Sequence, residues 1–246
     1  MKLLASAITF AALALFGPAE AVVGGAGTDA RYADRTLMIL TRGVEGAGFC
    51  TAVVLSPRVV MTAAHCARSP HDMRGFYRDA GQKPIFVDVE AVVVHPEYRA
   101  DAVARRIVSI DLALVRLASP LPSGFDPAQL AAPLAPGPEV GASVVVAGYG
   151  LSREADAKSG GVLRSAPLAV REPSSQILLW SGGRGVGTPG ACQGDSGGPI
   201  FGTDGETVVA LVAWSSGRKG RKCGDLTQGP LIGPLRPWID SIARRW

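Results

Sequence analysis

Short apolar runs separated by turn residues fill the chain from residue 22 onward. The runs are rich in β-branched residues, and most are closed by Gly or Pro. Runs of this length and composition predict strands rather than helices. We expect strands at residues 36–41, 49–55, 58–62, 85–95, 111–117, 143–147, 176–180, 198–201 and 207–213. The pattern therefore predicts an all-β fold.

Residues 119–138 interrupt this pattern. The segment is rich in Pro, Ala and Leu and carries little charge, which suits an extended connection better than a helix. The predicted strands on its two sides form similar sets. We therefore expect two β domains, the first over residues 22–125 and the second over residues 126–246.

Only the C-terminus has a helical pattern. Pro237 can occupy the first turn of a helix over residues 237–246. Such a helix places four apolar side chains on one face, at a period of about 3.6 residues. These are Trp238, Ile239, Ile242 and Trp246. We expect this face to dock on the second β domain.

The first 21 residues have the order of a secretory signal peptide. Lys2 precedes an apolar run over residues 3–16, and small residues around position 20 offer a cleavage site. An uncleaved membrane anchor is the alternative, but it needs about 20 apolar residues, and Gly17 and Pro18 end the run too early. We expect a secreted or periplasmic protein that leaves the membrane after cleavage.

The composition agrees with an ordered globular protein. Of the 246 residues, 47% are hydrophobic and 19% are charged, and the 31 glycines and 18 prolines favour short elements joined by turns. The leader contains one basic and one acidic side chain, so the mature chain keeps the formal charge of +4. Basic residues cluster at 218–222 and 244–245 without interleaved aromatic residues, which favours a solvated loop over nucleic-acid binding.

The four cysteines form an even set. Export implies an oxidising compartment, so two disulfides are expected among Cys50, Cys66, Cys192 and Cys223. Three pairings are possible, and the spacing alone does not choose among them. Zinc ligation is the competing interpretation, but the chain has no Cys-x-x-Cys or His-x-x-x-His spacing to support it.

Residues 194–199 (GDSGGP) are the most informative stretch. Glycines on both sides of Ser196 allow unusual backbone dihedrals that aim amides into an open site. A bare Gly-x-Ser-x-Gly is equally compatible with an ordinary turn, but the full hexapeptide is far less common by chance. Ser196 is therefore a candidate nucleophile.

A serine nucleophile needs a base, and histidine is the usual one. The chain has three histidines. His71 lies in a polar loop and His95 at a strand end, where surface or structural roles are the ordinary interpretation. His65 differs because it stands in residues 62–66 (TAAHC), next to a cysteine.

Three motifs stand at residues 62–66 (TAAHC), 111–114 (DLAL) and 194–199 (GDSGGP). Together they resemble the signatures of the trypsin/chymotrypsin family of serine proteases, in the family's order. The resemblance covers residues 22–246 and suggests a secreted, bacterial-type member. It implies two antiparallel six-stranded β-barrels with the active site between them, and endopeptidase activity through an acyl-enzyme. An ordinary strand-end aspartate is the other interpretation of Asp111.

The same resemblance assigns roles to individual residues. It implies that His65 is the general base, that Asp111 orients it, and that the amides of Gly194 and Ser196 form the oxyanion hole. It also implies disulfides Cys50–Cys66 and Cys192–Cys223. Neither disulfide is catalytic.

Val22 resembles the family's mature amino terminus, whose ammonium pairs with the aspartate before the serine, here Asp195. In the usual precursor a Lys or Arg stands before that terminus, whereas here Ala21 does. Since residues 19–21 are themselves a signal-peptidase site, we hypothesise that export alone creates the active terminus.

The predicted specificity pocket departs from that of trypsins. Gly190 stands where trypsins carry the aspartate that selects Lys or Arg, and we assign the pocket walls to Trp214, Ser215 and Gly229. A neutral pocket open at Gly190 and Gly229 predicts apolar substrate side chains, and Ser215 narrows it toward smaller ones. Two further departures are Ala213, where the family has a serine that holds the triad aspartate, and the charged loop at 218–222.

Two rival classes remain to be weighed. A catalytically silent binding protein on the same fold usually lacks a triad residue, and here none is missing. An esterase of the α/β-hydrolase type needs the order Ser, acid, His, which is not the order found. We expect a monomer that cleaves proteins or peptides, is restrained by a protein inhibitor, and needs no cofactor or metal.

Overall fold

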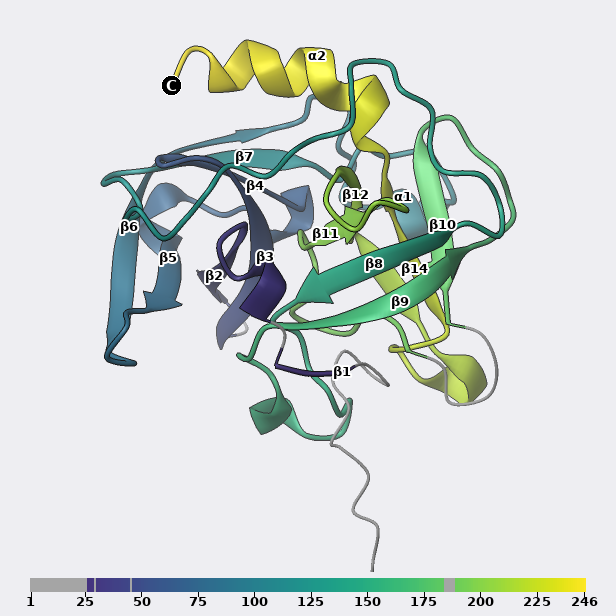
Figure 1. The fold of residues 1–246 in the computed structure, drawn as a ribbon, viewed down its shortest axis with the longest axis horizontal. Helices are drawn as coiled ribbons and strands as arrows, with labels where there is room; N and C mark the ends of the chain where they lie inside the picture. The colour runs from purple at the N-terminus through teal and green to yellow at the C-terminus, as the bar shows by residue number, and fades with distance from the viewer. Residues whose placement is uncertain (1–25, 29, 45, 184–188) are drawn as a thin grey trace, which may run out of the picture.

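The strands form two sheets, and the first closes into a barrel (Figure 1). The computed structural model describes residues 26–28, 30–44, 46–183 and 189–246. The barrel has the strand order β2-β3-β4-β7-β6-β5, and all neighbours are antiparallel. Its strands are β2 (Thr36–Gly43), β3 (Gly46–Ser56), β4 (Val59–Thr62), β5 (Met73–Arg78), β6 (Pro84–Val94) and β7 (Ala113–Leu117).

The second sheet curls without closing among the described residues. Its order is β12-β11-β8-β9-β10-β14-β13, with β1 paired to β9 as an eighth strand. Its strands are β1 (Ala26–Thr28), β8 (Ser143–Gly148), β9 (Arg164–Val170), β10 (Leu178–Gly182), β11 (Pro199–Phe201), β12 (Val208–Leu211), β13 (Trp214–Ser216) and β14 (Leu226–Pro230). The all-β class with two barrel-like units is confirmed, although the second unit is a curled eight-stranded sheet and not a closed six-stranded barrel.

All nine predicted strand runs overlap an observed strand, and five observed strands were not predicted. The missed strands lack a run of β-branched residues: β5 contains two arginines and a glycine, and Pro167 stands within β9. β1 also lies within the range expected for the first barrel, yet it pairs with β9 of the second sheet. Pairing partners far along the chain decide these strands, so local sequence does not reveal them.

Helix α2 (Ile232–Ala243) begins five residues before the predicted start. The residue that precedes it, Leu231, gives no side-chain cap, so the usual start signal is missing from the sequence. Pro237 lies inside the helix and cannot donate to the Gly233 carbonyl. That carbonyl instead accepts a hydrogen bond from the N–H of Leu134 (2.8 Å), which explains why a proline is tolerated there.

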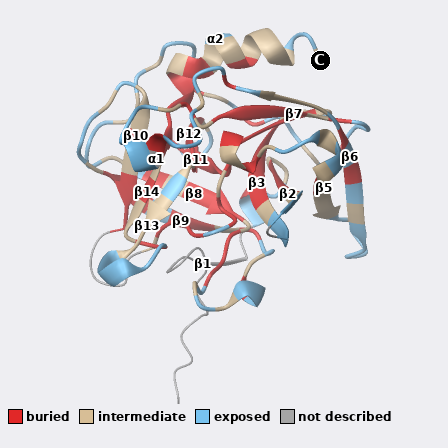
Figure 2. Ribbon diagram, turned by 180° about the vertical axis from the view of Figure 1, so that it is seen from behind, coloured by how far each residue is buried: buried red, intermediate tan, exposed pale blue. Residues whose placement is uncertain are grey.

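The helix packs against strands of both sheets, β12 and β7, and so covers more than the second unit on which it was expected to dock (Figure 1). One buried cluster unites its inner face with both sheets. Members from the first unit include Met61, Leu112 and Leu114, and the second unit and the helix add Phe201, Leu211, Ile232 and Ile239. Figure 2 shows buried residues running through β7, β3, β8 and β9.

Short helices make up the rest of the regular structure that the described residues contain. They are α1 (Ala102–Arg105) and the 3-10 helices Ala30–Tyr32, Ala64–Cys66, Pro70–Asp72, Ala157–Ser159 and Arg218–Gly220. In the described part of the chain no helix has the length and apolar character needed to cross a bilayer.

The shared core predicts that Leu114 is critical for stability. Its side chain is fully buried in the cluster that joins the two units. Leu114→Ala should lower the free energy of unfolding by about 2–5 kcal/mol, because it removes apolar contacts and leaves a cavity. Urea denaturation followed by tryptophan fluorescence measures the change. The exposed Val44→Ala serves as control and should shift stability by less than about 0.5 kcal/mol.

Candidate active site

His65 and Asp111 form a directly bonded pair at the mouth of the first barrel. The Nδ1 of His65 lies 2.7 Å from one carboxylate oxygen of Asp111, and the backbone N–H of His65 donates to the other oxygen (2.9 Å). His65 stands in the 3-10 helix Ala64–Cys66, directly after β4, while Asp111 precedes β7, which pairs with β4. The double contact holds the imidazole in one orientation and leaves its Nε2 facing outward.

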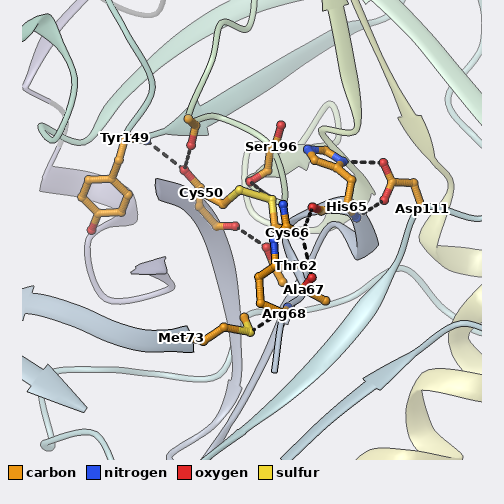
Figure 3. The surroundings of a disulfide bond; sticks show 12 residues. Cys50, Thr62, His65, Cys66, Ala67, Arg68, Met73, Asp111, Tyr149 and Ser196 are labelled. Carbon is orange, nitrogen blue, oxygen red and sulfur yellow. Dashed lines mark hydrogen bonds and ion pairs between the residues drawn. A yellow bond between two sulfur atoms is a disulfide. The ribbon is translucent and has the colours of Figure 1, made fainter. Parts of the chain in front are cut away.

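Ser196 comes from the second unit and lies beside this pair. Figure 3 shows the second ring nitrogen of His65 directed toward the Ser196 side chain. The Ser196 carbonyl accepts a hydrogen bond from the N–H of Thr51 in β3 (2.9 Å), so the serine loop is anchored to the first barrel. The three residues predicted from separate motifs are therefore brought together across the junction of the two units.

The loop around Ser196 needs its glycines. Gly194 has φ +98° and Gly197 has φ +79°, both in the left-handed region. A Cβ on Gly194 would also lie 2.3 Å from a ring carbon of Phe49. Among the described residues, neither the N–H of Gly194 nor that of Ser196 makes a hydrogen bond. Two free donors beside a serine are what an oxyanion hole requires.

Asp195 is fully buried behind the serine. Its two carboxylate oxygens accept hydrogen bonds from the N–H groups of Gly150 (2.8 Å) and Cys192 (2.9 Å). Burial raises the pKa of Asp195 to about 6, although these two hydrogen bonds and the charge of Arg164 act in the opposite direction. No ion pair to Asp195 occurs within the described part of the chain.

Comparison with known proteins identifies the family. A family model described as Trypsin matches residues 23–229. The chain belongs to the trypsin family. It is therefore a serine-type endopeptidase that hydrolyses peptide bonds.

Individual relatives agree with this assignment. A trypsin of Simulium vittatum is 29% identical over 219 residues, which cover 80% of this chain and 83% of the relative. Trypsin eta of Drosophila melanogaster is 25% identical over 219 residues, or 80% of this chain and 79% of that protein.

Solved structures support the fold alone, since their identities are lower. Human heparin binding protein matches with a TM-score of 0.71 and 22% identity, over 90% of this chain and 96% of that one. An inactivated protease paralogue of the scabies mite has a TM-score of 0.71 and 24% identity, over 90% of this chain and 99% of that one.

The disulfides of this trypsin-family enzyme are those that the resemblance implied. Cys50 is bonded to Cys66 and Cys192 to Cys223. The first disulfide joins β3 to the short helix that carries His65 (Figure 3). Cys50, His65 and Cys66 lie close enough together to suggest a metal site, but the disulfide occupies both sulfurs and so removes them as ligands.

Gly190 and Gly229 each have no room for a side chain. A Cβ on Gly190 would lie 1.6 Å from the Gly224 carbonyl oxygen, and one on Gly229 would lie 1.5 Å from the Leu211 carbonyl oxygen. Both glycines pack against backbone on that side, and the open pocket expected at these two positions stays a prediction. Gly229 does line a cavity beside His65, together with Trp214.

The sequence interpretation overlooked Thr227. Its buried hydroxyl accepts a hydrogen bond from the N–H of Ala191 (2.9 Å), the residue after Gly190. In the sheet, Thr227 is paired with Ser181 on one side and Ser215 on the other. A row of three hydroxyl residues therefore stands near Gly190, and strand register, which the sequence does not reveal, is what brings them together.

The remaining predicted residues have ordinary roles or lie outside the described chain. Asp225 follows the predicted pocket wall closely in sequence and could supply a charge there, but its carboxylate pairs with Arg218 and Arg171 and so is not free for the pocket. The ring of His95 packs against Trp238, as expected for a structural histidine, and burial lowers the pKa of His95. Val22 lies outside the described residues, and its contact with Asp195 stays a prediction.

Proposed function

We propose that Ser196 is the nucleophile of this endopeptidase, with His65 as its general base and Asp111 as the residue that orients the base. The observation that carries the proposal is the double contact between His65 and Asp111, with the free ring nitrogen turned toward Ser196 (Figure 3). A histidine held in this way presents an unprotonated Nε2 to the serine hydroxyl.

The reaction then proceeds in two halves. Ser196 Oγ attacks the peptide carbonyl carbon while His65 Nε2 takes the hydroxyl proton. His65 returns this proton to the departing amine, and an acyl-enzyme remains. A water molecule attacks the acyl group in the same way, His65 again carries the proton, and Ser196 is regenerated. The N–H groups of Gly194 and Ser196 stabilise the negative oxygen that forms in each half.

Labelling of the serine tests this assignment. A fluorophosphonate or sulfonyl fluoride should modify Ser196, and Ser196→Ala should abolish both the labelling and the peptidase activity, with a loss in kcat of about a millionfold. Mass spectrometry of the labelled peptide and a peptide hydrolysis assay measure the two effects.

Ser174→Ala is the matched control, because Ser174 is an exposed serine away from the proposed triad. It should label and cleave like the unchanged protein. Modification of another serine, or activity that survives in Ser196→Ala, would refute the assignment.

A neutral substrate pocket is the second part of the proposal. Gly190 supplies no carboxylate, Asp225 is paired to two arginines, and the buried hydroxyl of Thr227 bonds to the N–H of Ala191, the residue after Gly190. A Lys or Arg side chain would lose water there without gaining a partner. We propose cleavage after small, uncharged residues, with Thr227 and Ser215 limiting their size.

Cleavage profiling with a peptide library measures this preference. We expect cleavage after Lys or Arg to be at least about a hundredfold less efficient than after small apolar residues, since an unpaired buried charge costs several kcal/mol. Thr227→Ser keeps the hydroxyl, removes a methyl group and should extend cleavage to larger residues. Strong cleavage after Lys or Arg would contradict the proposal.

Activation by export is the third part of the proposal. We propose that removal of residues 1–21 outside the cytoplasm frees the ammonium of Val22, which pairs with the buried Asp195. The support is the state of Asp195 itself, since a fully buried carboxylate with two backbone donors still lacks a cation among the described residues.

The pH dependence of stability tests this pairing. Without a cation, burial raises the pKa of Asp195 from its ordinary value of 3.8 to about 6 in the folded state, so stability falls as pH rises from about 4 to about 6. A chain extended by two glycines before Val22 should therefore lose about 3 kcal/mol of stability between pH 4 and pH 7, whereas the chain that begins at Val22 should keep it because the ammonium pairs with the carboxylate. Urea unfolding at pH 4 and pH 7 gives the difference.

Asp195→Asn in the extended chain should remove this loss, because the amide does not titrate. The extended chain should also be far less active than the chain that begins at Val22. Equal activity and equal pH dependence in the two chains would rule out the ion pair.

A further inference from the structure

We infer that this endopeptidase selects substrates carrying an acidic side chain within a few residues of the cleaved bond, and that Arg106 binds that side chain. The inference rests on the proposed function, because it treats the cavity next to His65 as part of the substrate cleft. It adds a residue and a charge preference that neither the motifs nor the triad contain.

The cavity has a volume of about 440 Å³. His65 and Asp111 line it. Trp214 of β13, Pro230 of β14 and several residues of the loop over residues 99–109 line it as well. Substrate bound at His65 therefore has this cavity as its immediate neighbour.

The charges that line the cavity are unbalanced. Among the described residues that line it, the only carboxylate is Asp111, which is already bonded to His65. Two arginines also line it, and Arg99 uses its guanidinium to donate to the carbonyls of Pro96 and Tyr98 (both 2.9 Å). The exposed Arg106 makes no hydrogen bond or ion pair with any residue that the structure describes. Its charge is available to a ligand.

The neighbouring arginine is not available to a ligand in the same way. Arg105 is paired with Asp101, four residues before it in the same loop (3.2 Å). The loop thus neutralises one of two consecutive arginines and leaves the other at the cavity. Arg106 also has a left-handed backbone (φ +54°), which is uncommon for a residue with a long side chain.

Hydrogen bonds close the loop that carries Arg106 at its base. The Ser109 hydroxyl accepts a hydrogen bond from the N–H of Arg99 (2.8 Å) and lies 3.3 Å from the Arg99 carbonyl. Nearer the tip, the N–H of Ile107 donates to the Ala102 carbonyl (3.1 Å). A loop ordered before binding loses less entropy when it binds a ligand.

Strand β13, which contributes Trp214 to the cavity lining, suits an extended peptide. β13 ends the second sheet and pairs only with β14 among the described strands, so its other edge can accept a further strand. The Trp214 side chain on β13 is 39% exposed, and Ile107 faces the same cavity. These apolar groups can pack against the methylene groups of a glutamate while its carboxylate reaches Arg106.

A set of fluorogenic peptides tests the inference. Each peptide carries Glu, Gln or Lys at one of four positions on either side of a fixed cleavage site. At one position we expect kcat/KM for Glu to exceed that for Gln by about three- to tenfold, as for a partly exposed charge pair. Since salt screens such pairs, the preference should shrink between about 0.01 M and about 1 M salt.

Variants assign the preference to one residue. Arg106→Gln should abolish it by lowering kcat/KM for the Glu peptide to that for the Gln peptide, and Arg106→Glu should make the Lys peptide the best substrate. Lys83→Gln is the matched control, because it removes one exposed positive charge from the hairpin between β5 and β6, away from the cavity. It should keep the preference.

Three results would overturn the inference. One is an enzyme that cleaves the neutral peptides without preferring Glu at any position, which leaves the proposed function intact. Another is an equal loss on the Glu and Gln peptides in Arg106→Gln, which would mean that Arg106 only supports the loop. A protein that cleaves no peptide and takes up no serine label would overturn the proposed function together with the inference.

Discussion

The buried carboxylate of Asp195 constrains the chain on every side of it. Its oxygens bind the N–H groups of Gly150 and Cys192, and a Cβ on Gly148 or Gly150 would lie within 2.4 Å of the carboxyl group, so both positions need glycine. Asp195 immediately precedes Ser196, and the same contacts therefore fix the backbone of the serine loop. Since a buried charge is costly without a partner, the geometry at Ser196 depends on what pairs with Asp195.

Much of the fold follows from local sequence patterns. The elements that these patterns do not predict depend on contacts with distant parts of the chain. Every predicted apolar run became strand, because β-branched residues suit a half-buried sheet surface. β5 and β9 are strands because distant segments pair with them. Helix α2 starts without a capping side chain and contains Pro237, whose missing N–H is compensated by Leu134 from the connecting segment. The local sequence around Pro237 does not show that the N–H of the distant Leu134 replaces the missing donor.

The candidate site also contains residues that the sequence predicts and residues that only the structure reveals. The resemblance of three motifs to the trypsin/chymotrypsin family predicted His65, Asp111 and Ser196 as the triad, and the structure brings these three residues together. Thr227 was missed because a residue count assigned the wall to Gly229, whereas the register across β10, β14 and β13 brings Thr227 beside Ala191. Arg106 was missed because an unpaired surface arginine looks like any other in sequence, and only the folded loop puts it at the cavity.

The proposed triad and the two residues that the sequence did not reveal, Thr227 and Arg106, have different roles in the proposed mechanism. The proposed triad would act on any peptide bond that reaches it, so it would add nothing to the choice of substrate. The small neutral pocket proposed at Thr227 would contribute little binding energy, because little apolar area would be buried there. Selection must then come from contacts further along the substrate, where binding energy can still be used to position the bond for attack. The cavity lined by Trp214 and Arg106 offers apolar surface and an unpaired charge next to His65. It is therefore the part of the cleft best suited to decide which proteins this enzyme cleaves.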